Sequence, residues 1–164
     1  MAQTLSIRTR QSLTNPLRPL STKGSSGFFL DTIEIPVGTT NDTGILYITL
    51  PVFVRTNRLN LGNDILGGGC TMDIGFYTLN GDRLTFTEVS STAYASAINM
   101  AVARDNQAPF RFESNNIDTY NYSAWQLAGL STPPKYGEFY VGLKFPGAVT
   151  TAGTVTLTIG TDDI

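Results

Sequence analysis

Four glutamates in the strand-rich part of the chain are the side chains best suited to acid–base chemistry. Two carboxylates can hydrolyse a glycosidic bond, one as the acid and the other as the base or nucleophile. The candidates are Glu34, Glu88, Glu113 and Glu138, and no two of them share a local motif. Glu34 and Glu138 stand where the outer face of a strand would place them, which favours solvated charge. Because the chain also contains no histidine, it lacks the commonest general base, and we expect no catalytic residue and no enzyme.

The glycines before Cys70 imitate a phosphate-binding loop only in part. Gly62 and Gly67 have the required spacing, but Gly68 stands where such a loop needs a lysine. A sharp turn before the next strand is the better interpretation. Cys70 itself opens an apolar strand face, where a free cysteine behaves as a small hydrophobe rather than as a nucleophile. The sequence predicts no cofactor and no metal site.

Aromatic side chains are concentrated in one loop-rich region. They are Tyr120, Tyr122, Trp125 and Tyr136. Such rings can stack on sugars and would then form a glycan-binding platform. They can equally close one end of a β-sandwich as an apolar plug, and Leu127 and Leu130 after Trp125 favour that interpretation.

Composition excludes several classes of protein. The 164 residues (17.7 kDa) suggest one domain, and only 15% are charged, against about 25% in typical soluble proteins. A net charge of −2 argues against a nucleic-acid partner of the basic type. One cysteine permits no internal disulfide. We expect no membrane association, because no apolar run approaches the ~20 residues of a spanning helix and no hydrophobic signal core opens the chain.

Residues 1–27 differ from the rest of the chain and are expected to form an extended N-terminal arm before a sandwich domain over 28–164. The first 24 residues contain four cations and no acid, whereas the other 140 contain 7 basic and 13 acidic residues. This arm either frays, as unanchored termini do, or becomes ordered on a partner surface. In the second case its apolar anchors are Leu13, Leu17 and Leu20, and its cations pair with acids through Arg8, Arg10 and Arg18.

From Phe28 onward the pattern is that of short strands. Apolar residues alternate with polar ones in 32–37, 45–54, 70–77 and 154–159, the period of a half-buried strand. Residues 80–82 (NGD) tolerate the backbone of a tight turn, which predicts a hairpin over 70–89. Two short helices are also expected, over 92–102 after Ser90-Ser91 and over 123–130. The fold class is therefore all-β, an antiparallel sandwich of the jelly-roll or immunoglobulin-like kind.

Several segments resemble, in the same order, the head decoration (cement) proteins of tailed bacteriophages. Residues 72–82 (MDIGFYTLNGD) are similar to the strand and turn of that family, and 94–98 (YASAI) to its helix. Residues 125–130 (WQLAGL) and 151–157 (TAGTVTL) are similar to its later motifs. The similarity covers about residues 28–160. The long arm and the tyrosines at 120 and 122 depart from the family pattern.

The resemblance implies a non-enzymatic β-sandwich that binds the major capsid protein on the outside of the virion and stabilises the shell. It also implies a homo-oligomer, with a trimer favoured. Two other functions remain open from the sequence: a carbohydrate-binding or host-recognition module, and a tail or neck component of the virion.

Overall fold

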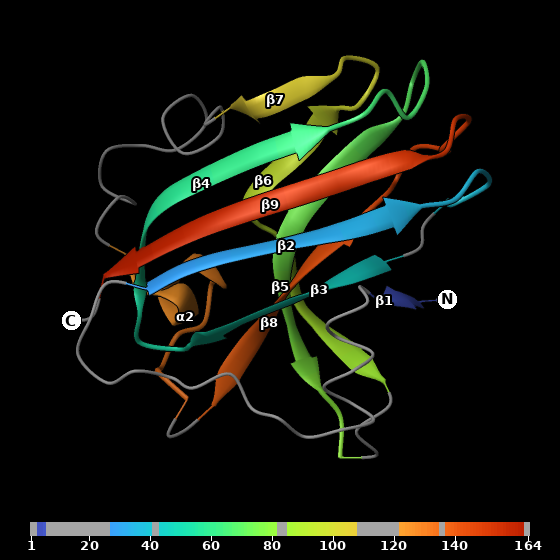
Figure 1. Ribbon diagram of the computed structural model, residues 1–164. Helices are drawn as coiled ribbons and strands as arrows, with labels where there is room; N and C mark the ends of the chain where they lie inside the picture. The colour runs from blue at the N-terminus through green and yellow to red at the C-terminus, as the bar shows by residue number, and fades with distance from the viewer. Residues whose placement is uncertain are drawn as a thin grey trace.

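The computed structural model describes residues 3–5, 27–40, 43–81, 85–107, 122–134 and 137–162. These residues form two facing β-sheets, which confirms the predicted all-β sandwich (Figure 1). The five-stranded sheet has the order β1 (Gln3–Leu5), β3 (Thr43–Pro51), β8 (Glu138–Lys144), β5 (Thr71–Leu79) and β6 (Phe86–Asn99). The four-stranded sheet has the order β2 (Gly27–Ile35), β9 (Gly153–Asp162), β4 (Arg55–Asn63) and β7 (Arg104–Gln107). Among the described helices, none is long and apolar enough to cross a membrane.

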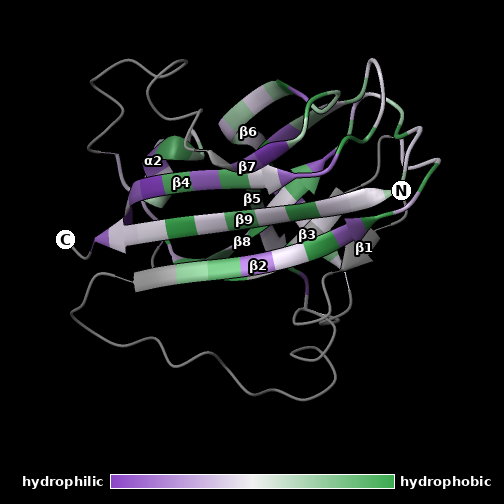
Figure 2. Ribbon diagram, turned by 45° about the horizontal axis from the view of Figure 1, so that its top comes forward, coloured by the Kyte–Doolittle hydropathy of each residue, from purple (hydrophilic) through white to green (hydrophobic). Residues whose placement is uncertain are grey.

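The core lies between the two sheets and follows the alternation of the sequence. Figure 2 shows this along β9, where hydrophobic bands alternate with bands of intermediate hydropathy. Inward-facing side chains of four strands are at most 2% exposed: Ile33 and Ile35 of β2, Leu46, Ile48 and Leu50 of β3, Met72, Ile74 and Phe76 of β5, and Val155, Leu157 and Ile159 of β9. The ring of Phe76 lies at the centre, 4.8 Å from the Tyr94 ring and 5.0 Å from the Phe139 ring.

The hairpin predicted over 70–89 is confirmed. β5 and β6 pair antiparallel, with Leu79 opposite Phe86 and Thr78 opposite Thr87. Beside the turn, the Asn80 N–H donates to the Thr85 carbonyl at 2.9 Å, and the Asn80 side-chain amide donates to the Thr85 hydroxyl at 2.8 Å. Local turn chemistry therefore sets this register.

The helix predicted over 92–102 is wrong, because β6 continues as a strand to Asn99. Its pairing with β5 shifts register at three points, and at each point β6 carries the extra residues. Such bulges break the period of two. The buried residues of β6 between 92 and 99 are consequently Tyr94, Ala95 and Ile98, whose spacing imitates a helix face.

Two further contacts hold the irregular part of β6 in place. Ala97 has a positive φ of 55°, and its N–H donates to Asp73 Oδ1 at 2.7 Å. On β5, a Cβ at Gly75 would overlap the Ser90 carbonyl oxygen, so glycine permits the close approach of the two backbones. Tertiary contacts with β5 therefore override the helical pattern of this segment.

Candidate functional site

A short helix at one end of the sandwich carries part of the predicted aromatic region. This helix, α2 (Ala124–Leu127), lies within the segment predicted over 123–130. At its start, the N–H and the hydroxyl of Ser123 both donate to Gln126 Oε1 at 2.9 Å. These bonds satisfy polar groups at the start of the helix. They also hold Ser123 in place, and with it the preceding Tyr122.

The turn between β3 and β4 (residues 52–54) holds α2 against the sandwich. The N–H of Ala124 donates to the Val54 carbonyl at 2.9 Å, and the N–H of Trp125 donates to the Val52 carbonyl at 3.0 Å. Ala124 is fully buried, and Trp125 packs partly buried against the main core. Trp125 thus covers this end of the core while keeping part of its ring at the surface.

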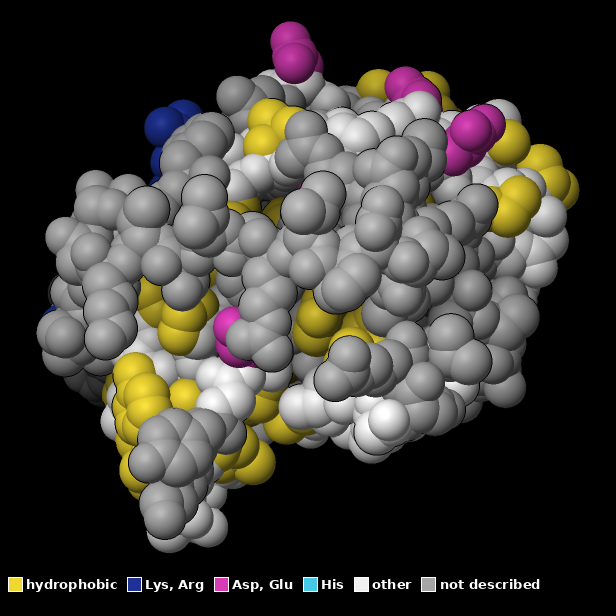
Figure 3. All heavy atoms as spheres, turned by 60° about the horizontal axis from the view of Figure 1, so that its bottom comes forward, with side chains coloured by type: hydrophobic (Ala, Val, Ile, Leu, Met, Phe, Trp, Pro, Cys, Tyr) yellow, Lys and Arg dark blue, Asp and Glu magenta, His cyan; other side chains and the backbone are white. Residues whose placement is uncertain are grey.

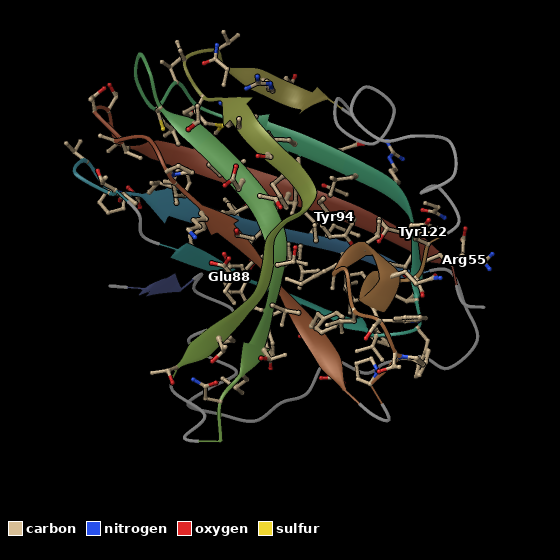
Figure 4. All side chains as sticks on the ribbon, turned by 180° about the vertical axis from the view of Figure 1, so that it is seen from behind. Arg55, Glu88, Tyr94 and Tyr122 are labelled. Atoms are coloured by element: carbon tan, nitrogen blue, oxygen red, sulfur yellow. The ribbon has the colours of Figure 1, made fainter. Side chains whose placement is uncertain are left out.

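Phe53 and Arg55 become neighbours of this helix, and of the preceding Tyr122, only in the folded chain. Phe53 is 48% exposed and Tyr122 is 36% exposed, while Arg55 forms a β-bridge with Ser123. Figure 4 shows Arg55 and Tyr122 together at the end of the sandwich that carries α2. The Arg55 Nε atom is buried and has no hydrogen-bond partner in the described part of the chain.

We name this surface the aromatic end, defined by Phe53, Arg55, Tyr122 and Trp125. Tryptophan, tyrosine and arginine are the residue types that dominate binding energy at protein interfaces, because each combines a large apolar area with a polar group. The aromatic end can therefore bind a protein partner through apolar contact supplemented by one cation.

Sequence reasoning missed Phe53 and Arg55. The alternation along β3 could have identified Phe53. Buried residues recur at every second position, 46, 48 and 50, and the same period continues through Val52 and Val54. Phe53 must then point outward, where a large aromatic side chain is unusual. No local pattern marks Arg55, because its place beside Tyr122 depends on contacts across 67 positions of sequence.

The first residues of the predicted arm bind the sandwich as a strand. β1 pairs parallel with β3, with Gln3 opposite Thr43 and Leu5 opposite Ile45. On this side, β3 has no described strand partner beyond Ile45, and such an edge can accept another strand by main-chain hydrogen bonds. β2 begins at Gly27, which pairs with Thr161 near the aromatic end. Residues 5 and 27 therefore lie at opposite ends of the sandwich (Figure 1).

The other predicted binding residues lie outside the described part of the chain. They are Arg8, Arg10, Leu13, Leu17, Arg18 and Leu20 of the arm, and Tyr120 and Tyr136 of the aromatic group. Their roles remain predictions. Hydrophobic side chains of the described residues nevertheless reach the surface in several places, as Figure 3 shows for one face.

Two of the groups considered for chemistry have surroundings that argue against reactivity. Burial raises the pKa of the Cys70 thiol, which has no exposed surface. Burial also acts to raise the pKa of Glu88, but hydrogen bonds from Lys144 and Ser91 outweigh it and leave that pKa below its usual range. The Lys144 Nζ lies 3.0 Å from Glu88 Oε2. The described residues contain no group of three or more acidic or cysteine side chains placed to hold a metal ion.

The outer face of the four-stranded sheet carries an open hollow of about 430 Å³. Most of its lining residues have polar side chains, and some of these side chains are hydrogen-bonded. Thr32 and Thr156 share a hydrogen bond of 2.9 Å between their hydroxyls, and Arg104 Nη1 donates to Asn63 Oδ1 at 3.1 Å. No aromatic ring lines this hollow, so it lacks the stacking surface that sugars favour.

Comparison with known proteins gives a fold likeness only. No family model matches the chain, and no curated protein matches it. A chain of the structure described as "Capsid of Ralstonia phage GP4" has a TM-score of 0.59 at 14% identity, over 99% of both chains. A chain of "Cyanophage Pam1 capsid asymmetric unit" has a TM-score of 0.53 at 15% identity, over 92% of this chain and 96% of that one. At such identities the similarity shows a shared fold along nearly the whole chain.

Proposed function

We propose that this protein is a non-enzymatic structural component of a tailed-phage virion, which binds the outer surface of the capsid and stabilises the shell. The whole-length fold likeness to chains of two phage capsid structures carries this proposal. Whole-length agreement matters because the likeness extends over 92% and 99% of this chain, rather than over one part of it. The major capsid protein is the proposed partner, and the protein acts as a homo-oligomer, with a trimer favoured.

In this proposal the aromatic end and the arm contact the shell together. The arm joins the sandwich at Gly27, where β2 pairs with the end of β9. In the same region, Arg55 of β4 lies opposite Asp162 of β9 in the strand register. A partner that binds the arm close to Gly27 would therefore also lie close to Phe53 and Tyr122. Two weak contact regions on one chain raise the affinity through effective concentration.

Apolar contacts should dominate the affinity of both regions. Full burial of a leucine or phenylalanine side chain is worth about 1.5–3 kcal/mol, whereas an exposed ion pair is worth ~0–1 kcal/mol. Alanine at Leu13, Leu17 and Leu20 should consequently weaken shell binding more than alanine at the three arm arginines. The opposite ranking would reject the leucines as anchors.

Co-sedimentation with matching capsids that lack this protein tests the proposal directly. The full chain should bind, and Phe53→Ala with Tyr122→Ala should reduce binding at least about tenfold. Leu30→Ala is the matched control, because Leu30 is 47% exposed but lies on the outer face of β2. Absence of binding by the folded wild-type chain, to mature and immature shells alike, would reject the capsid role.

Glycan recognition is the second candidate, because Tyr122 and Phe53 both present exposed ring surface at the same end. A host polysaccharide would then change the fluorescence of Trp125 in a saturable way, and Tyr122→Ala would abolish the change. Fluorescence that stays constant across the titration would leave the capsid proposal as the better one. Labelling of intact particles separates head attachment from a place in the tail or neck.

A further inference from the structure

The end of the sandwich opposite α2 is formed by four loop segments whose described residues contain almost no charge. We name it the neutral loop end, and it comprises residues 36–40, 64–70, 100–103 and 145–152, which gather on one side in Figure 1. Asp64 is the single charged side chain among these residues. Its Oδ2 accepts a hydrogen bond of 2.8 Å from the Thr154 N–H, so this carboxylate has a hydrogen-bond partner within the chain.

Large apolar side chains project from this surface, beside its single described carboxylate. Val37 is 61% exposed, Val102 is 56% exposed and Ile65 is 52% exposed. They are the three most exposed large hydrophobic residues in the described part of the chain. Single exposed hydrophobes are ordinary, but three of them on neighbouring loops with little charge are typical of an interaction site.

Backbone hydrogen bonds join the loops that carry these side chains. The Gly38 N–H donates to the Val149 carbonyl at 2.9 Å, the Thr150 N–H to the Leu66 carbonyl at 3.0 Å, and the Leu66 N–H to the Met100 carbonyl at 3.0 Å. The three exposed residues lie within two positions of members of this network.

Close packing of the same loops makes the surface stiff. Gly67 has a φ of 117°, and a Cβ there would overlap the Thr150 side chain, so the two loops are in direct contact. A surface that is already ordered loses little conformational entropy on binding. The neutral loop end is therefore preorganised for a partner in a way that a flexible loop cluster is not.

We propose that the neutral loop end is the surface through which copies of this chain associate with one another. Charge favours this occupant. Residues 28–164 carry a net charge of −6 (7 basic against 13 acidic residues), so two sandwiches repel where their acidic faces meet, and the four cations of residues 1–24 offset only part of that charge, to −2 for the whole chain. Two copies can approach closely at the neutral loop end, where charge is sparse and apolar side chains gain from mutual burial. The inference deepens the proposed function and rests on it for its place in a virion.

Analytical ultracentrifugation of the full chain tests this assignment. The wild-type protein should self-associate, and the association should persist in added salt, because salt does not screen apolar contacts but would weaken ionic contacts between the basic arm of one copy and the acidic sandwich of another. Ile65→Asp and Val102→Asp should each raise the dissociation constant about 30-fold or more, the effect of an unpaired buried charge of about 2 kcal/mol. Leu30→Asp is the matched control and should associate like the wild type.

Folding and shell binding are measured on the same variants. Native tryptophan fluorescence checks that each is folded, and the milder Ile65→Thr should move the dissociation constant in the same direction by a smaller factor. A monomeric wild type, or association unchanged in both aspartate variants, would overturn the inference. If the wild type is monomeric and Ile65→Asp loses capsid binding, the surface belongs to the shell contact. Self-association without capsid binding would retain this interface and reject the proposed function instead.

Discussion

Removal of the Tyr94 hydroxyl should cost the fold a specific and measurable amount of stability. The hydroxyls of Tyr94, on β6, and Thr56, on β4, lie 2.5 Å apart and join the two sheets across the core. Thr56 is fully buried and Tyr94 is 5% exposed, so water cannot replace a lost partner at Thr56. A buried polar group left without its partner costs about 1–3 kcal/mol, and we expect Tyr94→Phe to lower the free energy of unfolding by that amount.

The matching change on the other strand makes the test sharper. Thr56→Val keeps the shape of the side chain and should cost a similar amount when made alone. In the double variant neither residue keeps a polar group at this contact, so it should be at least about 1 kcal/mol more stable than the sum of the single changes implies. Urea unfolding followed by the fluorescence of Trp125, the only tryptophan, measures all four proteins. Strictly additive costs would show that this contact between the sheets does not couple the two residues.

Three other expectations follow from single contacts. Below pH ~4.5 the free energy of unfolding of the wild type, measured in urea, should fall by up to about 1 kcal/mol more than that of Glu88→Gln. The pKa of Glu88 is lowered in the native state, so acid must protonate a carboxylate that is paired with Lys144. Gly75→Ala should lower the melting temperature far more than Gly68→Ala, since a Cβ at 75 meets backbone and one at 68 meets nothing within 4 Å; equal melting temperatures would contradict the close approach of β5 and β6. Cys70 should react with a thiol reagent only when urea unfolds the chain, and fast labelling of the native protein would show that its burial is not maintained.

Local pattern alone predicted a large part of the sandwich. The alternation at Ile33 and Ile35, at Met72, Ile74 and Phe76, and in 154–159 is enough to place strands, because a period of two buries one face of an extended chain. The hairpin turn after Leu79 and the short helix after Ser123 were likewise predictable, since turn and cap preferences act over a few residues.

Only the tertiary structure decided the course of β6 and the composition of the aromatic end. The spacing of Tyr94 and Ile98 suits a helix face as well as a bulged strand, and the pairing with β5 selects the strand. The aromatic end requires Arg55 to reach Ser123, and the pairing of β1 with β3 requires Gln3 to reach Thr43. Such contacts join residues far apart in the sequence, so the local sequence around each residue does not predict them. Composition and periodicity therefore determined that this chain forms a sandwich, whereas the approach of distant strands decided which side chains share its surfaces.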